Sequence, residues 1–223
     1  MNESKTMTNE LDAIKEEGKL RLPADVVTTF VADQDELDAA GVPATVSKIG
    51  TTVPDVTLLS ITGAPVTLRE VRGGRPAVVV FYRGAWCPYC NLTLRSYQSA
   101  LEPELNRLGT SLIAVSPQKP DGSLSMKEKN ELSFPVLSDP ANTLARALGI
   151  VARPTPGTRA AQLKLGLDIS TLNIDEETDL PMPTVIILDG EGTIRWIDVH
   201  PNYTTRSEPQ DILDAYKATL RGE

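Results

Sequence analysis

The sequence predicts an α/β domain in which a central mixed sheet is flanked by helices, and three observations carry that prediction. Short apolar segments alternate with amphipathic ones along the chain, without an internal repeat. The segment 77–82 (AVVVFY) is apolar on both faces, as expected for a central strand that helices cover on each side. Toward the carboxyl end, two apolar segments flank the turn Asp189-Gly190-Glu191-Gly192, which predicts a hairpin.

Composition limits the classes of function. The chain has 223 residues, of which 40% are hydrophobic and 23% charged, enough for one ordinary domain or two small ones. Its 22 basic and 30 acidic residues give a net charge of -8, the wrong sign for binding nucleic acid or an anionic membrane surface. Apolar runs are far shorter than the roughly 20 residues of a spanning helix, and residues 1–10 lack the apolar core of a signal peptide. We therefore expect a soluble, cytoplasmic protein.

Residues 1–45 are expected to form an N-terminal helical arm. Leu11 and Ile14, followed by a stop at Gly18, indicate one short helix. A second helix is expected to begin at Pro23 and to end before Gly41. The arm could pack on the domain or on a partner subunit, and the sequence leaves both open.

Residues 46–223 are expected to form the α/β domain. Its expected elements up to residue 116 are a strand over 56–61, its return over 66–68, the buried strand over 77–82, a helix that ends at Gly109, and a strand over 111–116. Pro103 lies inside that helix and should kink it, because proline has no N–H to donate.

The second half of the domain continues the alternation. Its expected elements are a loop over 117–122, a helix over 125–132, a strand over 134–137, a helix that Asp139-Pro140 opens and Gly149 ends, the hairpin 184–199, and a closing helix over 209–220. Residues 151–180 show weaker periodicity, with a helix expected around 159–167, and are interpreted as an insertion.

The only two cysteines lie three apart, as Cys87-Pro88-Tyr89-Cys90. A structural disulfide framework needs several separated pairs, so this spacing indicates a working site in a reducing compartment. No metal is expected, because two thiolates and the single histidine, His200, leave a tetrahedral zinc site one ligand short.

The placement of the cysteines predicts their chemistry. Cys87 lies where the buried strand ends and a helix begins, with Pro88 in the first helical turn. A thiol there faces unpaired backbone N–H groups and the positive end of the helix dipole, which favour the thiolate. Residues three apart in a helix lie about 5 Å apart, within disulfide range. We expect the more exposed Cys87 to be the attacking sulfur and the shielded Cys90 to resolve the intermediate.

Two neighbours of Cys87 are candidates for binding substrate, and each has an alternative. Arg83 is the nearest cation in sequence and either holds the thiolate or is a solvated loop charge. Trp86 either shields the site from water or caps the core. For the pair as a whole, the alternative is two inert buried cysteines.

These motifs together resemble the peroxiredoxin-like branch of the thioredoxin-fold superfamily, the alkyl hydroperoxide reductase and thiol-specific antioxidant (AhpC/TSA) family. The resemblance covers about residues 50–220 and implies a thioredoxin-like fold. The matching residues are Gly50, Pro54-Asp55-Val56, Leu58, Phe81 to Pro88 (FYRGAWCP), Leu137-Ser138-Asp139, Val185 to Asp189 (VIILD) and Gly192 to Trp196 (GTIRW).

The resemblance implies a thiol-dependent peroxidase without a cofactor. Cys87 would take the peroxidatic position and attack hydrogen peroxide or an organic hydroperoxide, which gives a sulfenic acid. Cys90 would condense with it to a disulfide. Thioredoxin, glutaredoxin or glutathione would then return the pair to dithiol, because the cycle needs an outside source of electrons. A second copy of the chain is a further possible partner, which would form a homodimer.

Two departures from the family pattern favour a second function. Where typical peroxiredoxins carry a hydroxyl residue and an arginine that hold the peroxide, this sequence has Gly84 and Pro183. Loss of one such donor typically costs on the order of 100-fold in rate.

The second hypothesis is a thiol-disulfide oxidoreductase, because Cys87-Pro88-Tyr89-Cys90 is similar to the glutaredoxin active site. Met182-Pro183-Thr184 resembles the cis-proline loop of that class, so we expect a cis bond there and Pro183 against the cysteines; the alternative is a trans proline that starts a strand. A third hypothesis is a non-enzymatic redox sensor that uses the helical arm as its interaction surface.

Overall fold

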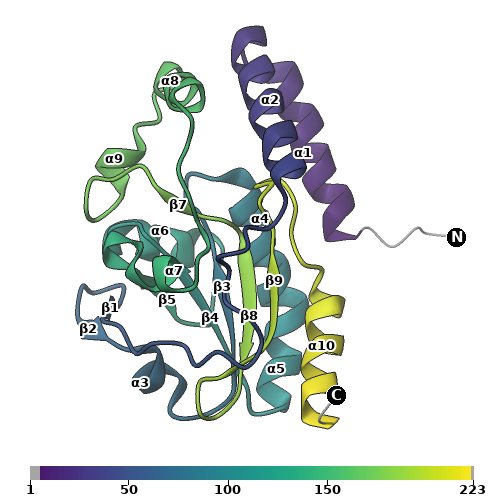
Figure 1. Ribbon diagram of the computed structural model, residues 1–223, viewed down its shortest axis with the longest axis vertical. Coiled ribbons are helices and arrows are strands. Elements are labelled where there is room, and N and C mark those ends of the chain that lie inside the picture. Colours follow the sequence, from purple (N-terminus) through teal and green to yellow (C-terminus); the bar gives the residue numbers. More distant parts are fainter. Residues whose placement is uncertain (1–5, 222–223) are drawn as a thin grey trace, which may run out of the picture.

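The protein, described here by a computed structural model of residues 6–221, is built around a seven-stranded mixed sheet (Figure 1). From edge to edge the strands are β2 (Pro65–Val66), β1 (Leu58–Leu59), β5 (Val136–Ser138), β4 (Ser111–Ser116), β3 (Ala77–Phe81), β8 (Thr184–Leu188) and β9 (Ile194–Val199). Strands β3, β4 and β5 run parallel, and the remaining pairs are antiparallel. The predicted α/β class and the β8–β9 hairpin are thus confirmed.

Strand β3 lies in the middle of the sheet and is buried along its whole length. Because strand side chains alternate between faces, Val78 and Val80 join the hydrophobic core on one face, and Val79 and Phe81 join the core on the other. This confirms the reading of 77–82 as a central strand covered on both sides.

Helices cover both faces of the sheet. On one face lie α4 (Pro88–Ser96), the π-helical turn η1 (Tyr97–Leu101), α5 (Glu102–Arg107), α6 (Pro120–Lys129) and α10 (Pro209–Arg221). On the other lie α3 (Leu68–Arg72) and α7 (Thr143–Ala147), and Figure 1 shows α7 in front of the sheet with α5 behind it.

The distortion expected at Pro103 takes the form of a π-helical turn just before it. Pro103 has no N–H for the carbonyl one turn back, and its ring crowds that carbonyl. In η1 the N–H of Glu102 instead donates to the carbonyl of Tyr97, five residues earlier. The wider turn lets α4 continue into α5 without exposing Leu101, which is fully buried.

Some predicted boundaries were wrong. Helix α6 begins at Pro120 rather than 125, because proline in the first turn needs no hydrogen-bond acceptor for an N–H. Strand β1 spans two residues instead of the six expected over 56–61. After Asp139 the chain forms a short 3-10 turn (η2, Pro140–Asn142), and the Asp139 carboxylate accepts the N–H groups of Leu144 and Ala145 in α7, each at 3.0 Å.

The N-terminal arm consists of two helices, α1 (Met7–Arg21) and α2 (Ala24–Ala40). Gly18 lies inside α1 and does not end it, whereas Gly41 ends α2 as expected. Met7 and Leu11 of α1 belong to the core cluster that holds α4, so in this chain the arm packs on its own domain. The arm's first five residues and the domain's last two lie outside the described residues, and the division near residue 45 stays a prediction.

Hydrogen bonds join the arm to the loop 200–208 that follows β9. The Glu208 carboxylate accepts from the N–H and the hydroxyl of Thr8, at 2.7 and 2.6 Å. Gln34 Nε2 donates to the Tyr203 hydroxyl at 3.2 Å. Asn202 Nδ2 donates to Asp38 Oδ2 at 2.7 Å. The arm and this loop therefore form one connected cover over the start of α4.

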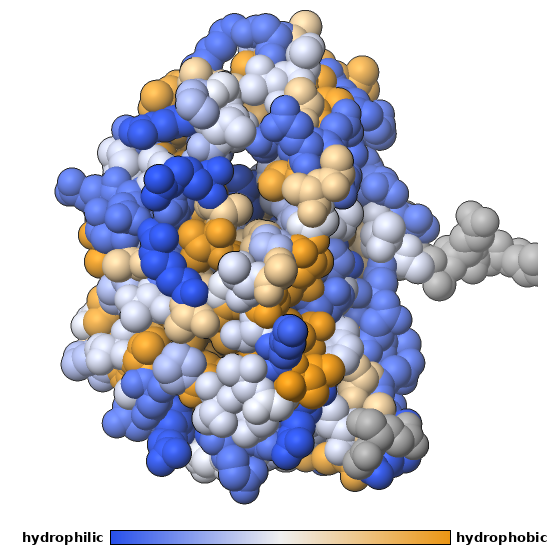
Figure 2. Space-filling view, viewed as in Figure 1, coloured by the Kyte–Doolittle hydropathy of each residue, from blue (hydrophilic) through white to orange (hydrophobic). Residues whose placement is uncertain are grey.

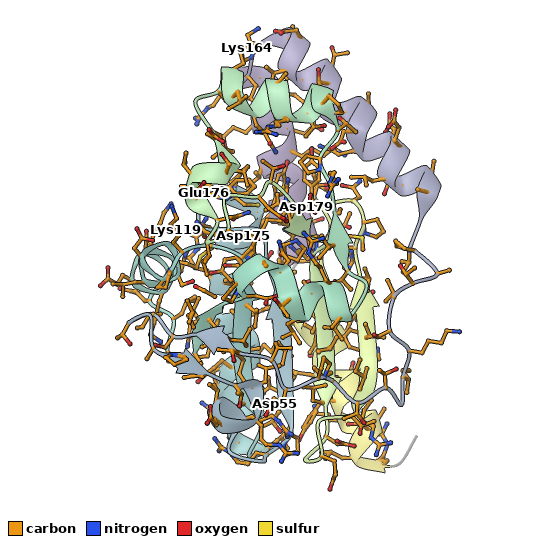
Figure 3. The ribbon with its side chains drawn as sticks, turned by 60° about the vertical axis from the view of Figure 1, so that its left-hand side comes forward. Asp55, Lys119, Lys164, Asp175, Glu176 and Asp179 are labelled. Atoms are coloured by element: carbon orange, nitrogen blue, oxygen red, sulfur yellow. The ribbon has the colours of Figure 1, made fainter. Side chains whose placement is uncertain are left out.

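Residues 151–181 form a small lobe on the domain. Strands β6 (Val151–Ala152) and β7 (Leu180–Pro181) pair, and between them lie α8 (Pro156–Lys164) and α9 (Ile169–Leu172). Lys164 Nζ of α8 binds the carboxylate of Asp25 in α2 at 2.6 Å, so the lobe also contacts the arm. Figure 3 shows Asp179 at the base of the lobe and Lys164 on α8 above it. That the lobe is an insertion stays a prediction.

Across residues 6–221, no helix has both the length and the apolar character needed to cross a membrane.

Candidate active site

Cys87 and Cys90 lie at the predicted junction between a buried strand and a helix. Cys87 is the N-cap of α4, Pro88 is its first residue, and the Cys90 N–H donates to Cys87 Sγ at 3.4 Å. The Asn91 amide donates to the carbonyls of Ala85 and Cys87, at 2.7 and 2.8 Å. These bonds hold the turn before the helix and keep the two sulfurs on the same side.

The two cysteines do not differ in exposure, although the sequence suggested that they would. Cys87 is 1% exposed and Cys90 is 0% exposed, and both are free thiols. The expectation of an open Cys87 was wrong, because the residue is part of the buried core cluster, which also includes Met7 and Leu11 of the arm. Exposure therefore cannot assign the roles of attacking and resolving sulfur.

Arg206, on the loop 200–208, is the cation that touches a sulfur. Its Nη2 donates to Cys90 Sγ at 3.4 Å, and its Nη1 donates to the carbonyls of Tyr203 and Thr205. Sequence reasoning missed this residue. It lies 116 positions after Cys90 and outside every motif, so only the tertiary fold brings the two together.

Arg83 lies at the same site but makes a different contact. It is 8% exposed, and its guanidinium lies 4.1 Å from the centre of the Tyr203 ring and 5.1 Å from that of Trp86. Such cation–π contacts hold a cation without neutralising it. The reading of Arg83 as a solvated loop charge is therefore wrong, because the residue is buried beside the cysteines.

The electrostatics of the pair oppose the expected ionisation. Burial, together with the hydrogen bond to Cys90 and the negative charge there, raises the pKa of Cys87 well above its usual value. Burial also penalises the Cys90 thiolate, but the hydrogen bond from Cys87 and the charge of Arg206 outweigh it and hold the pKa of Cys90 well below its usual value. The helix N-terminus alone does not ionise Cys87, because the sulfur is buried too deeply.

The two arginines at the site, Arg83 and Arg206, are not paired with acidic side chains of the described residues. Within the described chain, no carboxylate lies within 4 Å of Arg83 or of Arg206. A buried guanidinium is costly unless an anion or strong acceptor meets it. The cysteine sulfurs are the groups that can supply the negative charge.

Trp86 offers an unused hydrogen-bond donor. Its indole Nε1 is buried and has no partner among the described residues. A Cβ at position 84 would overlap that nitrogen, so only glycine leaves room for the ring. Glycine at position 84 therefore leaves the space that the indole N–H of Trp86 occupies.

Pro183 lines a pocket beside the site rather than closing a cis-proline loop. The described residues contain no cis peptide bond, so the Met182–Pro183 bond is trans and the expected cis bond was wrong. Arg83, Tyr203 and Leu37 share the pocket walls with Pro183, between α2, the lobe and the loop 200–208. Figure 2 shows a hollow in the upper part of this face, where apolar and polar surfaces meet.

Hydrogen bonds hold His200 to polar side chains at the end of β9 and in the following loop. Its ring nitrogens lie 3.0 Å from Asp198 Oδ2 and 2.8 Å from Thr205 Oγ1, which fixes the start of the loop that carries Arg206. No cluster of three or more histidine, cysteine, aspartate or glutamate side chains suited to a metal ion occurs in residues 6–221.

Comparison with known proteins identifies the family of this chain. The profile of the AhpC/TSA family matches residues 49–197, about two thirds of the chain, and this range includes both cysteines. The chain belongs to the AhpC/TSA family. Peroxiredoxin Q from Gentiana triflora is 26% identical over 171 residues, which cover 77% of this chain and 65% of that protein. Alkyl hydroperoxide reductase E from Mycobacterium bovis is 30% identical over 105 residues, 46% of this chain and 68% of that one.

Solved structures agree on the fold of this AhpC/TSA protein. The peroxidoxin BcpB of Mycobacterium tuberculosis matches with a TM-score of 0.59 and 22% identity, over 78% of this chain and 97% of that one. Reduced Prx3 of Vibrio vulnificus, solved with hydrogen peroxide, matches with a TM-score of 0.61 and 20% identity, over 76% and 98%. At these identities the likeness shows the thioredoxin-like fold, as the motifs implied.

Family and relatives together support a thiol-dependent peroxidase of peroxiredoxin type, an antioxidant oxidoreductase. A peroxide substrate and a thiol reductant follow from the same family. This confirms the class of enzyme expected from the motifs.

Proposed function

We propose that Cys87 attacks the terminal oxygen of a hydroperoxide and that Cys90 resolves the product. The S–O bond forms as the O–O bond breaks, which leaves a sulfenic acid on Cys87 and releases water or an alcohol. Cys90 then displaces hydroxide to form a disulfide, and an external dithiol reduces it. The observation that carries the proposal is the Cys90 N–H aimed at Cys87 Sγ across one turn of α4, inside the region that matches the family.

Arg83, Trp86 and Pro183 are proposed to bind the substrate. The Trp86 indole N–H supports this role because it is an unpaired donor next to Cys87, and it can meet the charge that develops on the leaving oxygen. Arg83 supports it because no carboxylate neutralises its charge. In this member of the family these two groups compensate for the donors that Gly84 and Pro183 do not supply.

We propose hydrogen peroxide and small organic hydroperoxides as the substrates. The pocket that Pro183 and Arg83 share is lined largely by apolar side chains, which suits the carbon part of an alkyl hydroperoxide. The name of the Mycobacterium bovis relative, alkyl hydroperoxide reductase E, agrees with this class.

For the reductant we propose thioredoxin, glutaredoxin or glutathione. One structural neighbour, a yeast mitochondrial 1-Cys peroxiredoxin, is described as using the glutathione/thioredoxin systems for thiol resolution. A cytoplasmic setting, where thiols are kept reduced, suits such donors. A homodimer stays a prediction, which light scattering behind a sizing column tests.

The competing function is a thiol-disulfide oxidoreductase. The Cys87-Pro88-Tyr89-Cys90 sequence at a helix N-terminus favours it. Against it stands the burial of both sulfurs, since a protein disulfide must reach the attacking sulfur directly. A redox sensor, in which the pair alters the contacts of the arm, is the remaining alternative.

Rapid mixing of the reduced protein with hydrogen peroxide tests the proposal, with insulin reduction as the parallel assay. Cys87→Ser should abolish peroxide consumption. Cys90→Ser should allow one turnover and leave a sulfenic acid on Cys87 that dimedone traps. Each variant is the matched control for the other, because the chain has only these two cysteines. Wild-type oxidation no faster than that of free cysteine would remove the peroxidase function, and fast insulin reduction would then favour the oxidoreductase.

A further inference from the structure

Aromatic rings, and not acids, hold the guanidinium of Arg83. The guanidinium carbon lies over the ring of Tyr203, 4.1 Å from its centre, and over that of Trp86 at 5.1 Å. No carboxylate lies within 4 Å of Arg83 in residues 6–221. A cation over the face of an aromatic ring is attracted to it without losing its charge. The closer ring, that of Tyr203, is therefore the main restraint on where this charge lies.

Tyr203 is itself fixed at both ends. Its hydroxyl accepts a hydrogen bond from Gln34 Nε2 of α2 at 3.2 Å, and its backbone carbonyl accepts one from Arg206 Nη1 at 2.7 Å. Gln34 is 7% exposed, so this bond lies inside the packed junction between the arm and the loop 200–208. The Tyr203 side chain cannot swing away from Arg83 without breaking its bond to the arm.

Both members of this hydrogen bond lie outside the range that matches the family. The AhpC/TSA profile covers residues 49–197, whereas Gln34 precedes that range and Tyr203 follows it. Arg83 and the cysteines lie inside it. Figure 1 shows the loop after β9 meeting the arm beside α4. Two segments that the family profile does not include therefore contact the family site in this chain.

We propose that Tyr203 is a positioning residue for the peroxide site: its ring holds the Arg83 guanidinium, and its hydroxyl links that ring to the arm through Gln34. Resting on the proposed peroxidase function, the inference makes the arm part of the active site as well as its cover. Arg83 is the group that would meet the charge on the oxygen that leaves the peroxide. Such a charge acts only if it is in place before the O–O bond breaks, and a misplacement of about 1 Å can cost on the order of 100-fold in rate.

A double-mutant cycle with hydrogen peroxide tests whether Tyr203 acts through Arg83. Tyr203→Leu removes the ring, so the rate of oxidation by peroxide should fall about 30-fold, the worth of a desolvated cation–π contact. In the Arg83→Gln protein the same substitution should change the rate less than about 2-fold, because the group that Tyr203 positions is gone. Tyr203→Phe keeps the ring and should regain most of the rate that Tyr203→Leu loses.

A second cycle tests the link to the arm. Gln34→Leu and Tyr203→Phe remove the same hydrogen bond, so each should lower the peroxide rate about 5-fold, and the double variant should lose no more than either one. Thr8→Ala is the matched control, because it removes a different hydrogen bond between the arm and the loop, the one from the Thr8 hydroxyl to Glu208 at 2.6 Å. This control should keep the wild-type rate.

Nuclear magnetic resonance locates the Arg83 side chain without any peroxide. In the reduced protein, the Nε–H signal of Arg83 is identified as the one that Arg83→Gln removes. A proton held over the face of an aromatic ring is shielded, so this signal should lie upfield of those of exposed arginines such as Arg159 on α8. Tyr203→Leu should move the signal toward theirs, and Thr8→Ala should not.

Each experiment has a result that overturns the inference. A Tyr203→Leu protein that melts like the wild type and keeps its peroxide rate does so, as does a loss of equal size in the Arg83→Gln protein. If Tyr203→Leu fails to fold, additive losses in Gln34→Leu and Tyr203→Phe, or an equal loss in Thr8→Ala, overturn it. A wild-type Arg83 signal that coincides with those of exposed arginines also overturns it.

The proposed function can fail separately. A wild-type protein that peroxide does not oxidise removes the peroxidase function, and the Arg83 signal then decides the inference alone. An upfield signal that Tyr203→Leu displaces upholds Tyr203 as the residue that positions Arg83.

Discussion

Two groups of arginines in this protein have opposite surroundings. At the base of the lobe, Arg153 and Arg146 of the neighbouring α7 both bind the Asp179 carboxylate, at 3.0 and 2.9 Å, and Arg146 also binds Glu177. At the cysteines, Arg83 and Arg206 are buried without any carboxylate within 4 Å in the described chain. At the lobe, carboxylates neutralise the arginines. At the cysteine site, a sulfur or a bound substrate would have to supply the negative charge.

The comparison distinguishes structural charges from chemical ones. A guanidinium paired with carboxylates at the surface fixes a loop and contributes little else. A buried guanidinium without such a partner favours any negative charge that appears near it, whether on a thiolate or on the oxygen that leaves a peroxide. Substitutions in the two groups should therefore change different properties of the protein.

The largest effect is expected from Arg83→Gln. Removing this charge leaves the leaving oxygen with one stabilising group fewer, so peroxide turnover should fall about 100-fold, as for loss of one transition-state donor. Stopped-flow oxidation by hydrogen peroxide measures it, with Arg146→Gln on α7, which pairs with Asp179 and does not line the pocket, as the matched control. Equal losses in both variants would break the distinction between the two groups of arginines.

A smaller effect is expected from Trp86→Phe, which keeps an aromatic ring and removes the indole N–H. If that N–H donates to the leaving oxygen, turnover should fall about 10- to 100-fold. That loss is at most the one usually seen when a single oxyanion-hole donor is removed. The same peroxide assay measures it, with Trp196→Phe as the control, since that ring also packs against the core but lies on β9. Unchanged turnover in Trp86→Phe would assign the stabilisation to the arginines alone.

The smallest effect is expected from Asp179→Asn in the lobe. Hydrogen bonds from Arg153 and Arg146 hold the pKa of Asp179 below its usual value, despite its burial. A carboxylate whose pKa is lower in the folded state stabilises that state above its unfolded pKa and stops doing so as the pH falls through the folded pKa. Urea unfolding should show a loss of about 1 kcal/mol at neutral pH, because the two guanidinium partners are solvent-exposed although the carboxylate is buried. The difference from the wild type should vanish in acid, with peroxide turnover unchanged throughout.

How much the sequence could predict depended on how local each feature is. The buried strand β3, the β8–β9 hairpin and the position of Cys87 before α4 follow from neighbouring residues, and all three were predicted. The contact of Arg206 with Cys90 joins residues 116 positions apart, and no periodicity or motif reports such a contact.

The errors at the site have a single cause. Helix geometry predicted an ionised and exposed Cys87, but the burial of that sulfur depends on tertiary packing, and burial raises its pKa instead of lowering it. The expected cis bond before Pro183 was likewise inferred from a short sequence match, whereas the surrounding fold holds the trans form.

The hydrogen bonds that join the arm to the loop 200–208 carry a consequence for the second half of the catalytic cycle. A peroxide molecule is small enough to diffuse through a brief gap in this cover, but a folded electron donor must bring its own cysteine into contact with the disulfide. Because both sulfurs are at most 1% exposed, regeneration by a protein donor therefore requires a displacement of this cover that oxidation by peroxide does not require.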